Sequence, residues 1–171
     1  MNSALILDRD GTINIDKGYI FDKSQFEIYP DVIPTLRKLG EFVKIIYTNQ
    51  SGIGRGFYTQ KDYQKLTEHM LNIFTEQGIK IHATIFCPHK PDDNCLCRKP
   101  NPYILKKLIK KYNINISTSF VIGDKTSDIQ LGKNIGMKTI LIKNDNKTDN
   151  EYDVKPDFEV YSFKMIEELL R

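Results

Sequence analysis

Short apolar runs alternate along this chain with longer stretches in which apolar residues recur every three or four positions. The short runs have the length of buried strands, and the longer stretches have the spacing of amphipathic helices. The predicted strands are ALIL (4–7), FVKIIY (42–47), ATIF (83–86), FVI (120–122) and KTILI (138–142). The predicted helices are 31–40, 60–77, 101–112 and 127–135. The alternation predicts an α/β fold of three layers, with a Rossmann-like parallel sheet covered by helices on both faces.

The helix ends carry local signals, and the C-terminal part changes character. Thr59 is typical of a helix start and Gly136 of a helix stop. Residues 144–157 are polar and are expected to form a surface excursion before a last apolar segment and an amphipathic stretch. The 171 residues contain no internal repeat, and we expect 1–171 to form a single domain.

Polar clusters directly follow four of the predicted strands. Residues 8–11 (DRDG) follow the first, 48–50 (TNQ) the second and 123–125 (GDK) the fourth, while a cysteine-rich segment follows the third. Because the carboxyl ends of parallel strands meet at one edge of an open sheet, these clusters should converge where such folds bind ligands. The pattern predicts an active site at that edge.

The acidic residues in these clusters favour a divalent cation. Asp8 and Asp10 end a buried strand, and Asp124 and Asp128 follow another. Asp and Gly are also the usual residues of helix caps and exposed turns, so the first pair alone does not decide the matter. Converging carboxylates repel each other unless a cation is present, and hard oxygen ligands select Mg²⁺.

Composition and charge limit the partners. The 25 basic and 22 acidic side chains leave a net charge of only +3, and the lysines of KKLIKK (106–111) have the spacing of one solvated helix face. We therefore expect no nucleic-acid partner. No run approaches the roughly 20 apolar residues of a membrane span. With no recognisable targeting segment at the N-terminus, the expected location is the cytoplasm.

The three cysteines and one of the three histidines lie within residues 87–97. Cys87, His89, Cys95 and Cys97 supply three thiolates and an imidazole, which is a complete tetrahedral set for structural Zn²⁺. The alternative is a group of small buried cysteines beside a surface histidine. The intervening residues PDDN are typical of a polar loop, which favours a closed zinc site without a catalytic role.

Four motifs in order, DRDGT (8–12), TN (48–49), RK (98–99) and GDKTSD (123–128), resemble those of the haloacid dehalogenase-like phosphatases. The resemblance spans almost the whole chain. It implies that Asp8 is the nucleophile and Asp10 the general acid and base. It also implies that Thr48 and Lys99 hold phosphoryl oxygens and that Asp124 completes a Mg²⁺ site with Asp8 and the backbone carbonyl of Asp10.

The resemblance leaves open the role of Asp128 and an alternative function for the chain. Asp128 fits the motif, but an acid in the first turn of a helix is equally well explained by the helix dipole. An inactive, zinc-stabilised binding module is the alternative outside the enzymes. The chain retains all five residues to which the resemblance assigns a chemical role, which argues against this alternative: Asp8, Asp10, Thr48, Lys99 and Asp124.

Within the class, the chain is most similar to the heptose-bisphosphate phosphatases of bacterial surface-sugar synthesis. The Gly18-Tyr19 pair, residues 48–59 (TNQSGIGRGFYT) and the directly joined CRKP carry this resemblance. It implies a cap-free monomer that cleaves the 7-phosphate of a heptose 1,7-bisphosphate, with loops 11–30, 50–58 and 88–97 closing the site. Histidinol-phosphate and DNA 3′-phosphatases remain the alternatives. The implied substrate contacts are Asp16, Lys17, Gly18, Tyr19, Thr48, Asn49, Gln50, Ser51, Arg98, Lys99 and Lys125.

Overall fold

A single parallel sheet organises the chain. The structure is a computed structural model that describes residues 1–143 and 154–170. Six strands pair in the order β3-β2-β1-β4-β5-β6, and every pairing is parallel. The strands are β1 (Ala4–Leu7), β2 (Val43–Asn49), β3 (Ala83–Cys87), β4 (Phe120–Gly123), β5 (Lys138–Ile142) and β6 (Phe158–Val160).

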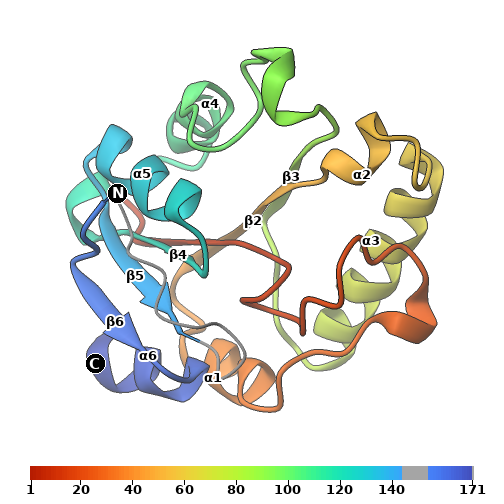
Figure 1. Cartoon of the computed structure of the whole chain (residues 1–171). Coiled ribbons are helices and arrows are strands. Elements are labelled where there is room, and N and C mark those ends of the chain that lie inside the picture. The colour runs from red at the N-terminus through yellow and green to blue at the C-terminus, as the bar shows by residue number, and fades with distance from the viewer. Residues whose placement is uncertain (144–153, 171) are drawn as a thin grey trace.

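Helices cover both faces of this sheet (Figure 1). One face carries α1 (Val32–Lys38), α3 (Gln60–Glu76) and α6 (Phe163–Leu170), and the other carries α4 (Tyr103–Lys111) and α5 (Thr126–Ile135). The short helix α2 (Ser51–Gly54) lies in the connection between β2 and α3. Single 3-10 turns complete the described structure at Lys23–Gln25, Pro91–Asp93 and Ile116–Thr118.

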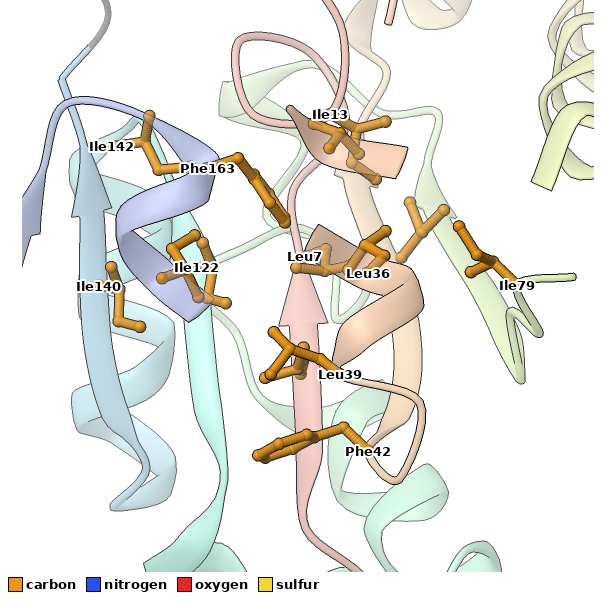
Figure 2. Close-up of a cluster of buried hydrophobic side chains, with 14 of the residues drawn as sticks. Leu7, Ile13, Leu36, Leu39, Phe42, Ile79, Ile122, Ile140, Ile142 and Phe163 are labelled. Atoms are coloured by element: carbon orange, nitrogen blue, oxygen red, sulfur yellow. The ribbon is translucent and has the colours of Figure 1, made fainter. Parts of the chain in front are cut away.

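Two hydrophobic layers hold the helices on the sheet. Along β1, Leu5 and Leu7 face one layer, and Ala4 and Ile6 face the other, as the alternation of side chains along a strand requires. Figure 2 shows the first layer, in which Leu7 lies among side chains of neighbouring strands and of α1 and α6. Both faces of the central strands are therefore buried, which explains why these strands appear in the sequence as continuous apolar runs.

The fold prediction is confirmed, with differences at the ends of elements. Helix α3 begins after Thr59, whose side chain accepts a hydrogen bond from the Asp62 backbone N–H (3.2 Å). Helix α5 ends at Ile135 and is followed by Gly136, which has a φ of 84°. Strand β2 extends two residues beyond its predicted end. The predicted surface excursion, 144–157, lies for the most part outside the described residues.

The order of the strands places the expected ligand-binding crevice at the carboxyl ends of the two central strands, β1 and β4. After β1 the chain builds outward through β2 and β3, then returns to add β4 on the other side of β1. The connections that follow β1 and β4 therefore diverge, which is the arrangement that opens a crevice at the carboxyl ends of strands. None of the described helices is long and apolar enough to span a membrane.

Candidate active site and metal-binding loop

A buried cluster of carboxylates surrounds one lysine at this edge. Asp8 follows β1, and Asp124 and Asp128 follow β4; one oxygen of each lies within 4.8 Å of the others. The Lys99 ammonium lies 2.7 Å from Asp8 Oδ1 and 2.6 Å from Asp128 Oδ1. All four residues are at most 5% exposed. Charges buried this deeply are stable only when they are paired or bind a metal.

Two glycines permit this close packing. A Cβ at Gly11 would lie 2.3 Å from Asp124 Oδ2, and the φ of Gly11 is +83°, a conformation that favours glycine. A Cβ at Gly123 would meet the Asp128 side chain at 2.3 Å. The glycines of DRDGT and GDKTSD thus give the acidic side chains room to approach.

The electrostatics keep Asp8 ionised. Burial alone would raise the pKa of Asp8, but the ammonium groups of Lys99 and Lys125 outweigh it and hold this pKa below its ordinary value. Burial raises the pKa of Asp128 to about 6, although Lys99 opposes the shift. Burial also disfavours the charge on Lys99, but Asp128 and Asp8 more than offset this and raise its pKa. Asp8 can therefore present a carboxylate to an incoming electrophile.

The carboxylate of Asp10 is not part of this cluster and is held by four hydrogen bonds. Arg9 donates from Nε to Oδ1 (3.1 Å) and from Nη2 to Oδ2 (2.7 Å). Asn14 donates to Oδ1 (3.1 Å) and Gln50 to Oδ2 (2.9 Å). Asp8 and Asp10, two residues apart after the same strand, thus occupy different surroundings, as distinct chemical roles require.

Strand β2 holds the backbone that carries Lys99. The Asn49 amide group donates to the Lys99 carbonyl (3.2 Å) and accepts from the Lys99 N–H (3.0 Å). The Tyr47 hydroxyl donates to the Cys97 carbonyl (2.9 Å), and the Tyr47 carbonyl accepts from Lys99 Nζ (2.6 Å). The lysine is therefore fixed at both its backbone and its ammonium.

Above the buried cluster lies a polar cleft of about 320 Å³. Arg98 and Lys125 add two cations to its wall, and Lys125 lies 3.4 Å from Asp16. Lys17, predicted to contact substrate, is not among the residues that line this cleft and pairs with Glu27 (2.9 Å). Thr48 and Lys99 are buried. The cleft is lined by Asp10, Asp16, Gly18, Tyr19, Asn49, Gln50, Ser51, Tyr58, Arg98, Lys125 and Ser127.

The four predicted zinc ligands converge at the loop between β3 and α4. The three Sγ–Sγ distances are 3.4, 3.2 and 3.7 Å. His89 Nδ1 lies 3.6 Å from Cys87 Sγ and 3.2 Å from Cys97 Sγ. Thiolates bound to one zinc ion at about 2.3 Å have comparable mutual separations, so this donor set fits a tetrahedral metal.

The sequence did not predict the buried residues that hold the site residues in place through hydrogen bonds. Arg9 is 1% exposed and contacts Asp10, Tyr58 donates to Gln50 (2.5 Å), and Tyr47 holds the Cys97 carbonyl. Gln50, predicted to contact substrate, is only 3% exposed. Its amide group donates to Asp10 and Thr48 and accepts from the Tyr58 hydroxyl. An arginine inside a motif at the end of a buried strand was the one available signal.

The fold is that of the haloacid dehalogenase-like hydrolases, and residues 96–165 match the family model described as HAD-hydrolase-like. A D-glycero-beta-D-manno-heptose-1,7-bisphosphate 7-phosphatase of Helicobacter pylori is 42% identical over 163 residues, covering 92% of this chain and 94% of the relative. A D-glycero-alpha-D-manno-heptose-1,7-bisphosphate 7-phosphatase of Campylobacter jejuni is 38% identical, covering 87% of each. The chain belongs to the family of the heptose-1,7-bisphosphate 7-phosphatases.

A solved structure shows the same fold over the whole chain. The D,D-heptose 1,7-bisphosphate phosphatase from B. bronchiseptica, complexed with magnesium and phosphate, has a TM-score of 0.86. It is 22% identical and covers 99% of this chain and 98% of its own. The family model and the relatives named above confirm the predictions of the class, of the family and of an enzyme that hydrolyses phosphoric monoesters.

Proposed function

We propose that this enzyme removes the 7-phosphate of a D-glycero-D-manno-heptose 1,7-bisphosphate in the cytoplasm. The observation that carries the substrate assignment is a set of cations at two depths. Lys99 is buried beside Asp8, and Arg98 and Lys125 line the open cleft above. Two positions for anions suit a substrate with two phosphates. The names of the relatives support the sugar and include both anomers at the 1-position.

In the proposed reaction Asp8 attacks phosphorus, and the bond between phosphorus and the sugar oxygen breaks. Asp10 gives its proton to the departing oxygen, so the products of this step are the sugar alcohol and an aspartyl phosphate. Asp10 then takes a proton from a water molecule that attacks phosphorus. This step releases inorganic phosphate and restores the Asp8 carboxylate. Thr48 and Lys99 are proposed to hold phosphoryl oxygens throughout.

The acidic cluster fits Mg²⁺. Three buried carboxylates share one small space with Lys99, and carboxylate oxygens gathered this closely are the ligands that a hard divalent cation prefers. Asp8 and Asp124, with the Asp10 backbone carbonyl, are the proposed ligands. When bound, Mg²⁺ neutralises charge on the phosphoryl oxygens. For Asp128 we propose a supporting role, because it already pairs with Lys99 and accepts from the Lys125 N–H (3.1 Å).

For the cysteine-rich loop we propose a structural Zn²⁺. The ligands are Cys87, His89, Cys95 and Cys97, which leave no coordination position for a reacting water. Elemental analysis of the purified protein should find about one zinc ion per chain, whereas Mg²⁺ should be exchangeable and required in the assay. An active preparation free of zinc would contradict the loop assignment.

A panel of substrates tests the proposal. It contains both anomers of the heptose bisphosphate, histidinol phosphate, an oligonucleotide with a 3′-phosphate and an aryl phosphate. We expect the highest kcat/KM with a heptose bisphosphate, because histidinol phosphate brings a cationic amine toward Arg98 and Lys125. A higher value for histidinol phosphate or the oligonucleotide would reject the sugar assignment.

The variant Asp8→Asn separates the enzyme from a binding module. It keeps the shape of the side chain and removes the nucleophilic carboxylate, so turnover of every substrate and the phosphoenzyme should both be lost. If Asp8→Asn still turned over substrate at the wild-type rate, Asp8 would not be the nucleophile.

A further inference from the structure

Arg9 lies between the two catalytic aspartates in the sequence and is almost completely buried. Its side chain is 1% exposed, although it carries a charge. The guanidinium binds Asp10 with two parallel hydrogen bonds, and its Cζ lies 5.7 Å from the ring centroid of Tyr63. Paired bonds of this kind fix the direction of a carboxylate as well as its distance, because both partners are planar.

Gln50 connects this pair to the rest of the site. Its Oε1 accepts from Arg9 Nη2 (3.2 Å) and from the Tyr58 hydroxyl (2.5 Å). Its Nε2 donates to Asp10 Oδ2 (2.9 Å) and to Thr48 Oγ1 (2.7 Å). Arg9 can only donate, and Asp10 Oδ2 accepts, so these two partners set the orientation of the Gln50 amide, with its NH₂ group toward Asp10 and Thr48. The Tyr58 hydroxyl adds a hydrogen bond to Oε1 and helps to hold the amide in this position.

We infer that Arg9 and Tyr58 are positioning residues for the acid and base Asp10, with Gln50 transmitting the effect of Tyr58. The inference rests on the proposed function. Neither residue needs to touch the reacting atoms, since the effect is to hold the Asp10 carboxylate within reach of them. A displacement of about 1 Å in a catalytic group can lower a rate by around 10²-fold.

Tyr58 also links this network to the loops around the cleft. Its ring stacks on Phe21 at a centroid distance of 5.5 Å, and Tyr58 itself lines the cleft. A Cβ at Gly52 would lie 2.2 Å from the Tyr58 ring, so the start of α2 packs directly on it. The segments 11–30 and 50–58 thus meet at Tyr58, a side chain that contacts Gln50 directly.

A role confined to folding is the competing explanation, because a buried arginine also stabilises a buried carboxylate. The two explanations differ in which chemical step they affect. With an aryl phosphate the departing group needs no proton, so Asp8 can be phosphorylated without Asp10, whereas hydrolysis of the aspartyl phosphate still requires it. Displacement of Asp10 alone should therefore cause the phosphoenzyme to accumulate.

The test uses Tyr58→Phe, which removes one hydroxyl, and Arg9→Lys, which keeps the charge but not the planar fork. We expect kcat for an aryl phosphate to fall about 10-fold in the first and around 10²-fold in the second. KM should change less than about 3-fold, and acid-quenched samples should contain more phosphoenzyme than wild type. Asp10→Asn is the reference for complete loss of the acid and base.

Tyr112→Phe is the matched control, because it also deletes a tyrosine hydroxyl that makes a hydrogen bond, to the His82 carbonyl (2.5 Å), outside the cleft. It should leave kcat and phosphoenzyme unchanged. If Asp10→Asn accumulates phosphoenzyme and Tyr58→Phe does not, the inference is wrong, even if Arg9→Lys fails to fold. If Asp10→Asn and wild type form no phosphoenzyme at all, the proposed function fails and the inference falls with it.

Discussion

Arg98 and Lys99 are neighbours in the sequence but occupy different depths of the site. Lys99 is 4% exposed and contacts Asp8, whereas Arg98 lines the cleft and donates to the His89 carbonyl (3.3 Å). A planar guanidinium at the wall of the cleft suits a second phosphate, the one that is not cleaved.

Arg98→Ala should therefore affect the bisphosphate much more than a simple aryl phosphate. A charge-assisted hydrogen bond contributes about 1.5–3 kcal/mol, which corresponds to roughly 10- to 100-fold in kcat/KM. Lys17→Ala is the control: it also removes one cation from the predicted contacts, but Lys17 pairs with the exposed Glu27 and should matter little. Equal losses on both substrates would place Arg98 in the general phosphoryl-binding machinery instead.

Gly11→Ala should disable the acidic cluster. The new methyl group would meet Asp124 Oδ2 at 2.3 Å, so we expect a weaker apparent affinity for Mg²⁺ and an activity loss of around 10²-fold. Gly78→Ala is the matched control, because Gly78 also has a positive φ (+71°) but no atom within 4 Å of the added Cβ. Both variants bear backbone strain of about 1–2 kcal/mol. A titration of activity with Mg²⁺ would separate the contact from the strain.

The sequence predicts the residues that would contact substrate or metal much better than the residues that hold them in position. Asp8 and Asp124 follow buried strands, so their shared edge follows from the fold alone. Arg9, Tyr47 and Tyr58 act through contacts between segments that are distant in the chain, and no spacing encodes those contacts. The resemblance implied substrate contacts for Asn49 and Gln50; both line the cleft, and their amide groups also make hydrogen bonds to protein groups that the sequence did not indicate.

Among the elements, the loop between β3 and α4 bears most directly on catalysis. Cys97 is two residues from Lys99, and its carbonyl is held by the Tyr47 hydroxyl. Asn49 holds the Lys99 backbone from the other side. A loop of polar residues and prolines buries little apolar surface, so a metal bond at Cys97 would supply rigidity that packing does not.

Cys97→Ser should lower turnover about 10-fold or more while leaving the protein folded, because the two hydrophobic layers do not include this loop. Circular dichroism, zinc content and turnover should be measured on one preparation. Leu96→Ala changes an exposed neighbour (57% exposed) that is not among the ligands and should behave as wild type. A folded, zinc-free variant with full activity would contradict preorganisation by zinc, and global unfolding would show that the loop supports the fold.

Element boundaries show where periodicity stops being informative. Thr48 and Asn49 continue β2 although both are polar, because the strand pairs with β3 as far as Cys87. Helix α2, at Ser51–Gly54, was expected only as part of a loop, since two glycines in four residues weaken any helical signal. Tertiary pairing and packing decide such segments, and the local sequence does not.

The molecule as a whole should behave as one cooperative unit and as a monomer. The layers on the two faces share β1, β2 and β4, so neither can be lost without exposing the other. We expect tyrosine fluorescence, available from nine tyrosines without tryptophan, to report the same denaturant midpoint as circular dichroism. Light scattering after size exclusion should give the mass of one chain. Separate midpoints would indicate more than one domain.

Lys99 lies in the sequence between the three strands of one half of the sheet and the three strands of the other. This position determines how much of the chain must be synthesised before the enzyme can become active. Residues up to Cys87 supply β1, β2 and β3, and residues from Phe120 supply β4, β5 and β6. The Lys99 ammonium contacts Asp8 from the first half and Asp128 from the second. A chain emerging from the ribosome therefore carries its nucleophile early but has no complete site until Asp128 is free to fold. The first turnover of each new molecule therefore requires that its two halves have already joined where β1 pairs with β4.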